Sequence, residues 1–211
     1  MQRTTTGTDR MKTGKTAPAA DRSPLARAVA EAVRILRDGG ILLYPTDTVW
    51  GLGCDATNSD AVKRIYALKQ SENKHAMLVL CASADMVVRY VDKAPAIAFE
   101  VAELATSPLT LILPGAVKLA PELIPDEGTL GVRIPDHEFC QALLRRFGKP
   151  IVSTSANLSG QPTPKRRSDI AADIVAGVDY AVHPRFEGHP TGKPSSIIAF
   201  SEEGVFQIIR E

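Results

Sequence analysis

Two segments of the sequence hold the side chains whose types and spacing could support chemistry. They read Tyr44-Pro-Thr-Asp-Thr-Val-Trp-Gly-Leu-Gly-Cys-Asp-Ala56 and Ile151-Val-Ser-Thr-Ser-Ala-Asn-Leu-Ser-Gly160. Each comes with a short aliphatic run that predicts a strand, so hydroxyl, amide and glycine backbone groups cluster where that strand ends. Open α/β sheets bind ligands at the ends of their strands. The two segments therefore predict a site for a small molecule.

Further polar and charged residues suit the same site. The predicted strand ends and the loops after them carry Thr46, Thr48, Lys69, Lys74, Arg133, Ser153, Ser155 and Asn157. Arginine forks onto a carboxylate, lysine meets phosphate as a point charge, and hydroxyl groups complete the shell, so we predict an anion-binding site. Structural roles stay open for some of them. Lys69 and Lys74 are alternatively solvated helix ends, and Arg133 alternatively belongs to a buried ion pair. Thr46 and Ser155 are alternatively explained by hydrogen bonds to turn backbone.

Several chemical motifs fail on spacing. The segment Gly188-His-Pro-Thr-Gly-Lys-Pro-Ser195 places three residues between its glycines and Pro194 at the Ser/Thr position, so it is not a phosphate-binding loop. Gln141 stands where a zinc-protease helix begun by His137 would need its second histidine, and we predict no structural metal. The chain has no Gly-x-Ser-x-Gly elbow, so its serines are expected to donate hydrogen bonds rather than to attack acyl groups.

The elements that position these residues follow from hydrophobic periodicity. Helices are predicted at 23–38, 58–69, 85–91, 95–105, 136–148 and 168–175. Strands are predicted at 41–44, 77–80, 109–113, 129–134, 178–182, 195–200 and 205–209, with a further strand beginning at 151. The expected helix caps include Asn58 or Ser59 for the second helix and Asp136 for the fifth. The first two strands and the helix between them are expected to form a β-loop-α-loop-β unit.

Composition limits the class of protein. The chain has 211 residues, 44% of them apolar, which fits a single globular domain. Its 25 basic and 24 acidic side chains give no global field for a nucleic-acid or membrane partner. No apolar run reaches the roughly 18 residues that a membrane helix needs. The odd cysteines Cys54, Cys81 and Cys140 predict buried thiols in a reducing, cytoplasmic compartment.

These observations predict the domain organisation and the fold class. Residues 1–22, rich in threonine and without the apolar stretch of a secretory signal, are expected to be a disordered tail whose basic residues leave RNA contact open. Residues 23–211 are expected to form one α/β domain. Its final hairpin requires antiparallel pairing, so we predict a twisted open sheet of mixed parallel and antiparallel strands with flanking helices.

From the first helix to Arg210, the chain resembles the YrdC/Sua5 family of threonylcarbamoyl-AMP synthases, in the short form without the extra C-terminal domain. The resemblance rests on the Tyr44 to Gly53 block, Lys69, Pro108-Leu-Thr-Leu-Ile-Leu-Pro114, Thr129-Leu-Gly-Val-Arg-Ile-Pro135, the serine-x-asparagine signature of Ser155 and Asn157, Ser195-Ser196-Ile-Ile and Ile208-Ile-Arg210. It implies a YrdC-like catalytic domain.

The resemblance also implies a reaction. L-threonine, bicarbonate and ATP would give threonylcarbamoyl-adenylate and pyrophosphate, with Mg²⁺ arriving on the nucleotide, and other proteins would transfer the group to adenosine 37 of tRNA. Threonine would be held by Thr48, Arg133, Ser153 and Ser196, in a pocket shaped by Thr46. ATP would be held by Lys69, Thr129, Ser155, Asn157, Thr163 and Arg210. Of these, Lys69, Arg133, Ser155 and Asn157 would carry the catalysis.

The sequence departs from the family at one position. The family's Lys-x-Arg reads Lys69-Gln70-Ser71, so an arginine offered to ATP is absent and only Lys74 or His75 is near enough in sequence to compensate. An RNA-binding or regulatory paralogue with weak or no synthase activity would show the same loss. A third interpretation is a carbamoyl-adenylate enzyme of hydrogenase maturation. Such enzymes usually carry zinc-finger and acylphosphatase segments, which this sequence does not contain.

Overall fold

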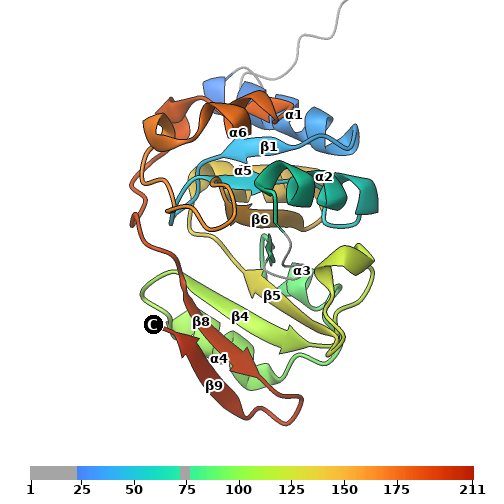
Figure 1. Ribbon diagram of the computed structural model, residues 1–211. Coiled ribbons are helices and arrows are strands. Elements are labelled where there is room, and N and C mark those ends of the chain that lie inside the picture. The colour runs from blue at the N-terminus through green and yellow to red at the C-terminus, as the bar shows by residue number, and fades with distance from the viewer. Residues whose placement is uncertain (1–22, 72–76) are drawn as a thin grey trace, which may run out of the picture.

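One mixed sheet organises the computed structural model, which describes residues 23–71 and 77–211. In sheet order its strands are β7 (Tyr180–Ala181), β1 (Leu42–Tyr44), β2 (Gly51–Gly53), β6 (Ile151–Ser155), β3 (Leu78–Leu80), β5 (Thr129–Arg133), β4 (Leu109–Pro114), β8 (Ser196–Phe200) and β9 (Phe206–Arg210). The pairs β1–β7, β3–β5 and β4–β8 are parallel and the other pairs antiparallel. Figure 1 shows the strong twist between β1 and β9. The predicted α/β class is confirmed.

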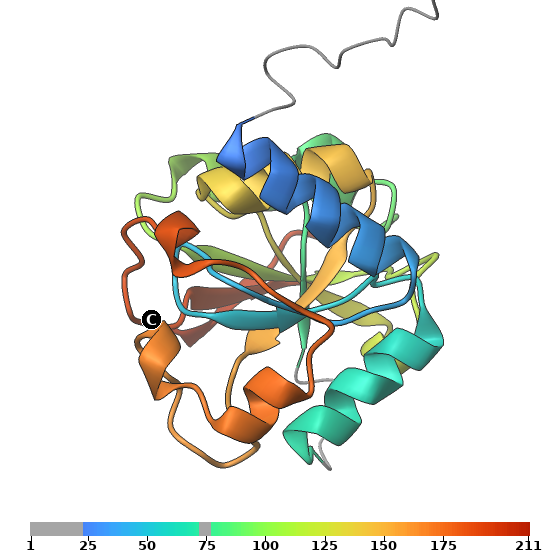
Figure 2. The same cartoon turned by 90° about the horizontal axis from the view of Figure 1, so that it is seen from above.

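Helices lie on both faces of this sheet. They are α1 (Pro24–Arg37), α2 (Ser59–Lys69), α3 (Ala84–Val87), α4 (Ala96–Leu104), α5 (Glu138–Phe147) and α6 (Ala172–Ala176), with short 3-10 turns η2 (Pro121–Leu123), η3 (Arg167–Asp169) and η4 (Pro184–Phe186). Seen from above, α1 and α5 cover one face, and α2 and α6 lie on the other (Figure 2). The buried apolar residues form two clusters, one on each side of the sheet.

The first signature segment contains a strand that sequence reasoning missed. Residues 44–56 were expected to follow a strand as a loop, but Gly51–Gly53 form β2 in the middle of the sheet. A Cβ atom at Gly53 would lie 2.6 Å from the carbonyl oxygen of Val152 and 2.7 Å from the Tyr44 ring. Strands that pack this closely require glycine. Because glycine is depleted from most strands, the sequence of this segment instead predicts a turn.

The predicted β-loop-α-loop-β unit is therefore assembled differently. The strand that precedes α2 is β2, which runs antiparallel to β6 as does β3. The parallel strands joined through α2 are thus β2 and β3, with β6 between them, and β1 runs the opposite way. The expectation that β1 and β3 form the unit was wrong, because the short glycine strand was not recognised.

Local capping sets most helix boundaries as expected. The side-chain oxygen of Asn58 accepts a hydrogen bond from the backbone N–H of Ala61 at 3.1 Å and begins α2. Gly148 ends α5 in the left-handed region, at φ 80°. The cap of α5 was wrongly assigned to Asp136, because the helix begins one residue later. His137 Nδ1 accepts from the Cys140 N–H, and the Asp136 N–H instead donates to Asp47 Oδ2 at 3.3 Å.

Two helical predictions were too long. The segment 85–91 is helical only in α3, because the chain then turns and the carbonyl of Tyr90 accepts a hydrogen bond from the Val117 N–H at 2.9 Å. The segment 168–175 divides into η3 and α6, since Asp169 bonds back to the N–H of Arg166 and closes a separate turn. The prediction for residues 1–22 lies outside the described residues.

The three cysteines are buried and form no disulfide, as predicted. Burial raises the pKa of all three thiols, that of Cys81 to about 12. They are therefore inert packing groups rather than nucleophiles. Within the described part of the chain, no helix has the length and apolar character needed to cross a bilayer.

One face of the sheet continues beyond its covering helices. Leu80 and Ile151 pack against the cluster formed by α1 and α5. Side chains alternate along a strand, so Leu78 and Ser153, two residues away, share that face. Arg133 also shares it, because it pairs with Leu80 in the parallel register of β5 and β3. This uncovered end of the face is where the candidate site lies.

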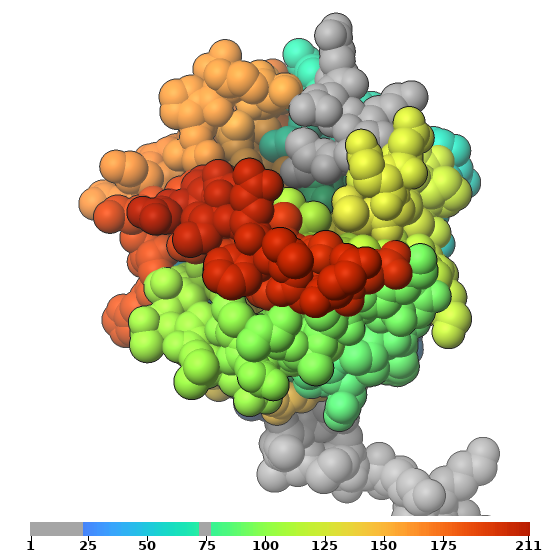
Figure 3. Space-filling view, turned by 90° about the horizontal axis from the view of Figure 1, so that it is seen from below, coloured from blue at the N-terminus to red at the C-terminus, as the bar shows by residue number. Residues whose placement is uncertain are grey.

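The opposite end of the sheet is an exposed edge. Every residue of β9 is exposed, including Phe206 at 58% and Ile208 at 53%. Figure 3 shows β8 and β9 beside α4 on the lower side of the molecule. The hairpin brings Arg210, near the end of the chain, back to the strand that carries Ser195 at its start.

Candidate small-molecule site

The sequence-predicted hydroxyl and arginine residues meet at one cavity of about 190 Å³, hereafter the site cavity. Its lining residues are Thr46, Thr48, Val49, Gly51, Leu78, Arg133, Ser153, Thr154, Ser155, Thr163, Pro194, Ser195 and Arg210. They come from β2 and the loop before it, from β3, β5 and β6, from the loop after β6, and from the segment before β8 and the end of β9. Drug-sized ligands occupy roughly 300 to 1,000 Å³, so this space suits a molecule the size of an amino acid.

Thr46 and Thr48 form the hydroxyl wall of the site cavity. The Thr46 hydroxyl donates to the carbonyl of Val49 at 2.7 Å and accepts from the backbone N–H groups of Thr48 and Val49. Its single proton is then used, so in the 2.9 Å contact between the two hydroxyls Thr48 is the donor. Thr46 therefore shapes the turn. The oxygen of Thr48 keeps lone pairs that can accept a hydrogen bond from a ligand.

Arg133 lines the site cavity, and not all of its hydrogen-bond donors have a partner among the described residues. Its side chain is only 4% exposed, and Nη1 forms an ion pair with Asp47. Its Nε is buried without a hydrogen-bond partner among the described residues. A buried donor without a partner is costly, and the Nε edge of a guanidinium is one side of its fork. The arrangement confirms the interpretation as a buried ion pair on one side of the guanidinium and leaves an unpartnered Nε donor on the other.

Serines from two parts of the chain complete this wall. Ser153 is buried in β6, and the hydroxyl of Ser195 lies 2.7 Å from that of Thr110. The predicted residue Ser196, the first residue of β8, does not line the site cavity, whereas its neighbour Ser195 does. Adjacent residues in extended chain face opposite ways, so an error of one position changes the face.

Lys69 holds the end of β6 rather than lining the site cavity. Its ammonium donates to the carbonyl oxygens of Ser155 at 2.6 Å and Asn157 at 2.7 Å, and its side chain is buried. Burial lowers the pKa of Lys69 to about 8. The lysine is thus not a solvated helix end. It places a titratable positive charge directly behind the serine-x-asparagine turn.

A second cavity of about 530 Å³, hereafter the outer cavity, adjoins the same turn. It is formed by residues 156–158, 161–165, 169 and 171, and it shares Thr163 with the site cavity. The Asn157 amide nitrogen donates to the carbonyls of Leu158 and Gln161, while its Oδ1 is buried without a hydrogen-bond partner among the described residues. Lys165 adds a cation to the wall. The larger volume and mixed polarity suit a nucleotide.

The structure leaves other predicted site residues at different places. Thr129 lies at the far end of β5 from Arg133 and lines neither cavity. The guanidinium of Arg210 lines the site cavity and donates twice to the carbonyl of Ser195, at 3.0 and 2.7 Å. Lys74 and His75, the suggested replacements for the missing arginine, lie outside the described residues.

Sequence reasoning missed three residues that build this site. Asp47 fixes Arg133, while Thr110 and Ser195 form a buried hydroxyl pair. Asp47 stands between the two predicted threonines. An acidic residue next to an expected anion site could have indicated that it pairs with a cation of that site. The pairing of Thr110 with Ser195 depends on the parallel contact of β4 with β8, which nothing local in the sequence indicates.

Comparison with known proteins identifies the family to which the chain belongs. Residues 34–211 match the model of the Sua5/YciO/YrdC family, whose description reads "Telomere recombination". The chain belongs to the Sua5/YciO/YrdC family. It is 33% identical over 172 residues to a threonylcarbamoyl-AMP synthase of Pseudoalteromonas translucida, covering 80% of this chain and 91% of that protein.

Longer members of the Sua5/YciO/YrdC family match over part of their length. A threonylcarbamoyl-AMP synthase of Bacillus subtilis is 36% identical over 169 residues, which are 78% of this chain and 47% of that protein. The crystal structure of Sua5 from P. abyssi, complexed with L-threonine, superposes with a TM-score of 0.74 at 28% identity. That match covers 82% of this chain and 50% of the other, so this chain spans about half of these longer relatives.

Proposed function

We propose that this protein is a threonylcarbamoyl-AMP synthase, a nucleotidyltransferase that converts L-threonine, bicarbonate and ATP into threonylcarbamoyl-adenylate and pyrophosphate. The observation that carries the proposal is the unpartnered Nε of Arg133, a residue that lines a cavity of amino-acid size together with Thr48. The names of the relatives support the same activity. A carboxylate and a hydroxyl group are what threonine offers to such a pocket.

Each polar group of threonine has a complementary partner in the site cavity. The carboxylate accepts from Nε of Arg133, which replaces a missing hydrogen bond with a charge-assisted one. The side-chain hydroxyl or the amine donates to the free lone pairs of Thr48, and Ser153 lies on the same wall. Ser196 has no place in this assignment, and Ser195 takes the position that it was expected to fill.

ATP belongs in the outer cavity, with its phosphates directed toward Thr163, where the two cavities meet. Lys69 stands behind this junction and supplies positive charge through the turn it holds. Mg²⁺ would arrive with the phosphates, because it keeps most of its waters and takes few protein ligands in nucleotide sites. The residues fit that mode, since Asn157 Oδ1 is an oxygen without a partner in the described structure.

The chemistry needs positioning more than a strong base. The threonine amine attacks the carbon of CO₂ and loses a proton to form a carbamate; from bicarbonate, the same carbamate forms with loss of water. One carbamate oxygen then attacks the α-phosphorus, and the bond to the leaving pyrophosphate breaks. Arg133 fixes the threonine end of this path, and the Lys69 turn fixes the nucleotide end. Meeting at Thr163, the two cavities bring the reacting ends together.

The proposal includes the setting of the enzyme. The adenylate would pass to tRNA-threonylcarbamoyl transferase proteins in the cytoplasm. RNA contact is not required for the synthase step itself. This part rests on the chemistry of the product, a reactive mixed anhydride that needs a downstream acceptor.

Pyrophosphate release tests the proposed function. The full-length protein should release pyrophosphate only when threonine, bicarbonate and Mg-ATP are all present. Arg133→Lys keeps the charge beside Asp47 but loses the fork, so we expect the KM for threonine to rise about tenfold to a hundredfold. Arg145→Ala, on the exposed side of α5, is the matched control and should be unchanged. Pyrophosphate release without threonine would contradict the assignment.

One observation favours the alternative of an RNA-binding or regulatory paralogue. Ser71 occupies the position of the family's phosphate-binding arginine, just after Gln70 ends α2 in the left-handed region. A paralogue of this kind would bind RNA and release no pyrophosphate in the same assay. The unpartnered Nε of Arg133 is the reason for preferring the synthase.

A further inference from the structure

A large cavity lies next to the site cavity and has no part in the proposed reaction. It measures about 500 Å³ and is formed between α3, α4 and the strands β4 and β5. We call it the apolar cavity, because its inner walls are hydrocarbon. The residues that form these walls are Ala84, Val87, Phe99, Ala102, Leu109, Leu111, Val132 and Ile134.

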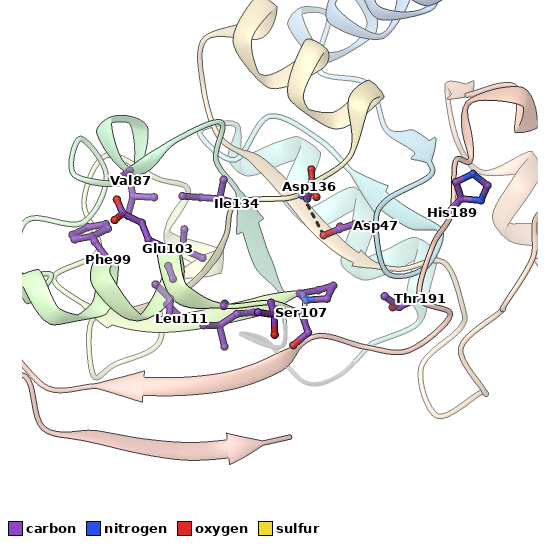
Figure 4. Close-up of a pocket in the computed structure, with 17 residues that line it drawn as sticks. Asp47, Val87, Phe99, Glu103, Ser107, Leu111, Ile134, Asp136, His189 and Thr191 are labelled. Atoms are coloured by element: carbon purple, nitrogen blue, oxygen red, sulfur yellow. Dashed lines mark hydrogen bonds between the residues drawn. The ribbon is translucent and has the colours of Figure 1, made fainter.

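Carboxylates line the apolar cavity at two places. Figure 4 shows Glu103 among the apolar side chains, and Asp136 beside Asp47 at the polar end. The Asp136 N–H donates to Asp47 Oδ2, which draws these two acidic residues to one place. His189 and Thr191 complete that end. No lysine or arginine is among the residues that line the cavity.

The apolar cavity is a separate compartment from the site cavity. The Asp47–Arg133 ion pair forms the partition, because Asp47 lines the apolar cavity and Arg133 lines the site cavity. The backbone N–H of Thr191 donates to the carbonyl of Asp47 at 2.9 Å, and the N–H of Gly192 donates to that of Thr48. The segment after η4 therefore seals the boundary. A ligand in one cavity does not occupy the other.

We propose that the apolar cavity binds a small organic cation, a hydrocarbon body that carries one ammonium group. The walls remove the hydrocarbon from water, and the volume lies within the range of small-molecule pockets. The ammonium meets Asp136 at the polar end or Glu103 among the apolar walls, and no lysine or arginine competes for either of them within the lining. Arg133 compensates the charge of Asp47, but an anion would still face Asp136 and Glu103, so the field of the lining disfavours fatty acids and phosphates.

The test uses three probes of equal length on the full-length protein. They are n-hexylamine, 1-hexanol and hexanoate, with binding followed by ligand-observed NMR and thermal unfolding. We expect n-hexylamine to bind about fivefold or more tightly than 1-hexanol, since partly exposed carboxylates contribute modestly, and hexanoate to bind least. Equal binding of amine and alcohol would overturn the cation assignment, as would binding of hexanoate.

Variants locate the site and separate its two parts. Ala102→Trp fills the apolar cavity from α4 and should abolish binding of both amine and alcohol, with Ala105→Trp as a second filling variant. Leu104→Trp is the matched control, because Leu104 is 81% exposed and does not line the cavity. Unchanged amine binding in a folded Ala102→Trp or Ala105→Trp protein would overturn the location.

The charge variant tests the carboxylates alone. The double variant Glu103→Gln with Asp136→Asn should bring amine affinity down to that of 1-hexanol, while alcohol affinity stays the same. Retention of the full preference for amine would contradict the role of these carboxylates. L-threonine binding should be unaffected in all of these variants, which keeps the result independent of the proposed function.

Discussion

At the residue scale, Asp47 decides how Arg133 can be used. The pair is buried, with side-chain exposures of 11% and 4%, and Nε of the arginine has no hydrogen-bond partner among the described residues. A buried arginine without its partner costs a protein roughly 3 to 5 kcal/mol. Asp47 therefore stabilises the empty site, and in the proposed function the Nε edge is left for the carboxylate of threonine.

Asp47→Asn should destabilise the protein and make threonine a stronger stabiliser. We expect the unfolding temperature to fall by about 5 to 15 °C, because the Arg133 charge loses its partner. Added L-threonine should then raise that temperature more than in the wild type, since its carboxylate supplies the missing negative charge. Asp136→Asn, which leaves the ion pair intact, is the control. An unchanged unfolding temperature in Asp47→Asn would show that the pair carries no stability.

Lys69 should make the rate of the reaction decrease at alkaline pH. Its folded-state pKa is about 8, lowered by burial, so its ammonium is lost as pH rises through that value. We expect kcat/KM for ATP to fall through about pH 8. The free energy of unfolding should change in the opposite direction. Above pH 8 the unfolded chain binds this proton more tightly than the folded chain does, so the free energy of unfolding should increase as pH rises from about 8 toward the ordinary pKa of lysine.

The difference between wild type and Lys69→Met isolates this group. The variant should lose the stability rise between pH 8 and 10 along with most activity, because the clamp on Ser155 and Asn157 is gone. A wild-type profile for ATP that stays flat to pH 9.5 would refute a role for the ammonium.

Ser71→Arg should tell a weakened synthase from an idle paralogue. Restoring a forked donor to the position after Gln70 is expected to lower the KM for ATP by about threefold to tenfold. The measurement is pyrophosphate release at saturating threonine. A rise in KM would mean that another cation already occupies the phosphate position.

At the scale of elements, the glycines of β2 let three strands approach one another. Gly53→Ala would place a Cβ within 2.7 Å of both Val152 and Tyr44, whereas at Gly51 the nearest atom would lie at 3.3 Å. We expect Gly53→Ala to lower the free energy of unfolding by about 1 to 3 kcal/mol and Gly51→Ala to lower it less. Urea denaturation would measure both. Equal stability of the two variants would contradict the close packing of β1, β2 and β6.

The helices and the longer strands could be predicted from the sequence because their information is local. Apolar residues at helical spacing and a cap such as Asn58 are enough to define α2. Three facts needed the fold: that Gly51–Gly53 is a strand, that Asp47 reaches Arg133, and that Ser195 rather than Ser196 faces the site cavity. Each depends on register or on contacts between distant segments, where one residue changes the face.

At the scale of the whole molecule, the site joins segments that lie far apart in the sequence. The loop between β1 and β2, the end of β5, the turn after β6 and the closing hairpin all meet at the site cavity. The sheet order explains this convergence, because β6 and β3 stand at its centre. In the proposed function, the two adjoining cavities separate the site for threonine from the larger space for ATP.

Competition between threonine and valine tests the central claim most directly. Valine has the shape of threonine but would leave a buried partner of the substrate hydroxyl unpaired, which costs roughly 1 to 3 kcal/mol. With both amino acids at equal concentration, mass spectrometry of the adenylate product should find the threonine adduct in about fivefold to a hundredfold excess over the valine adduct. Equal amounts of the valine and threonine adducts, or no adduct of either, would contradict the account.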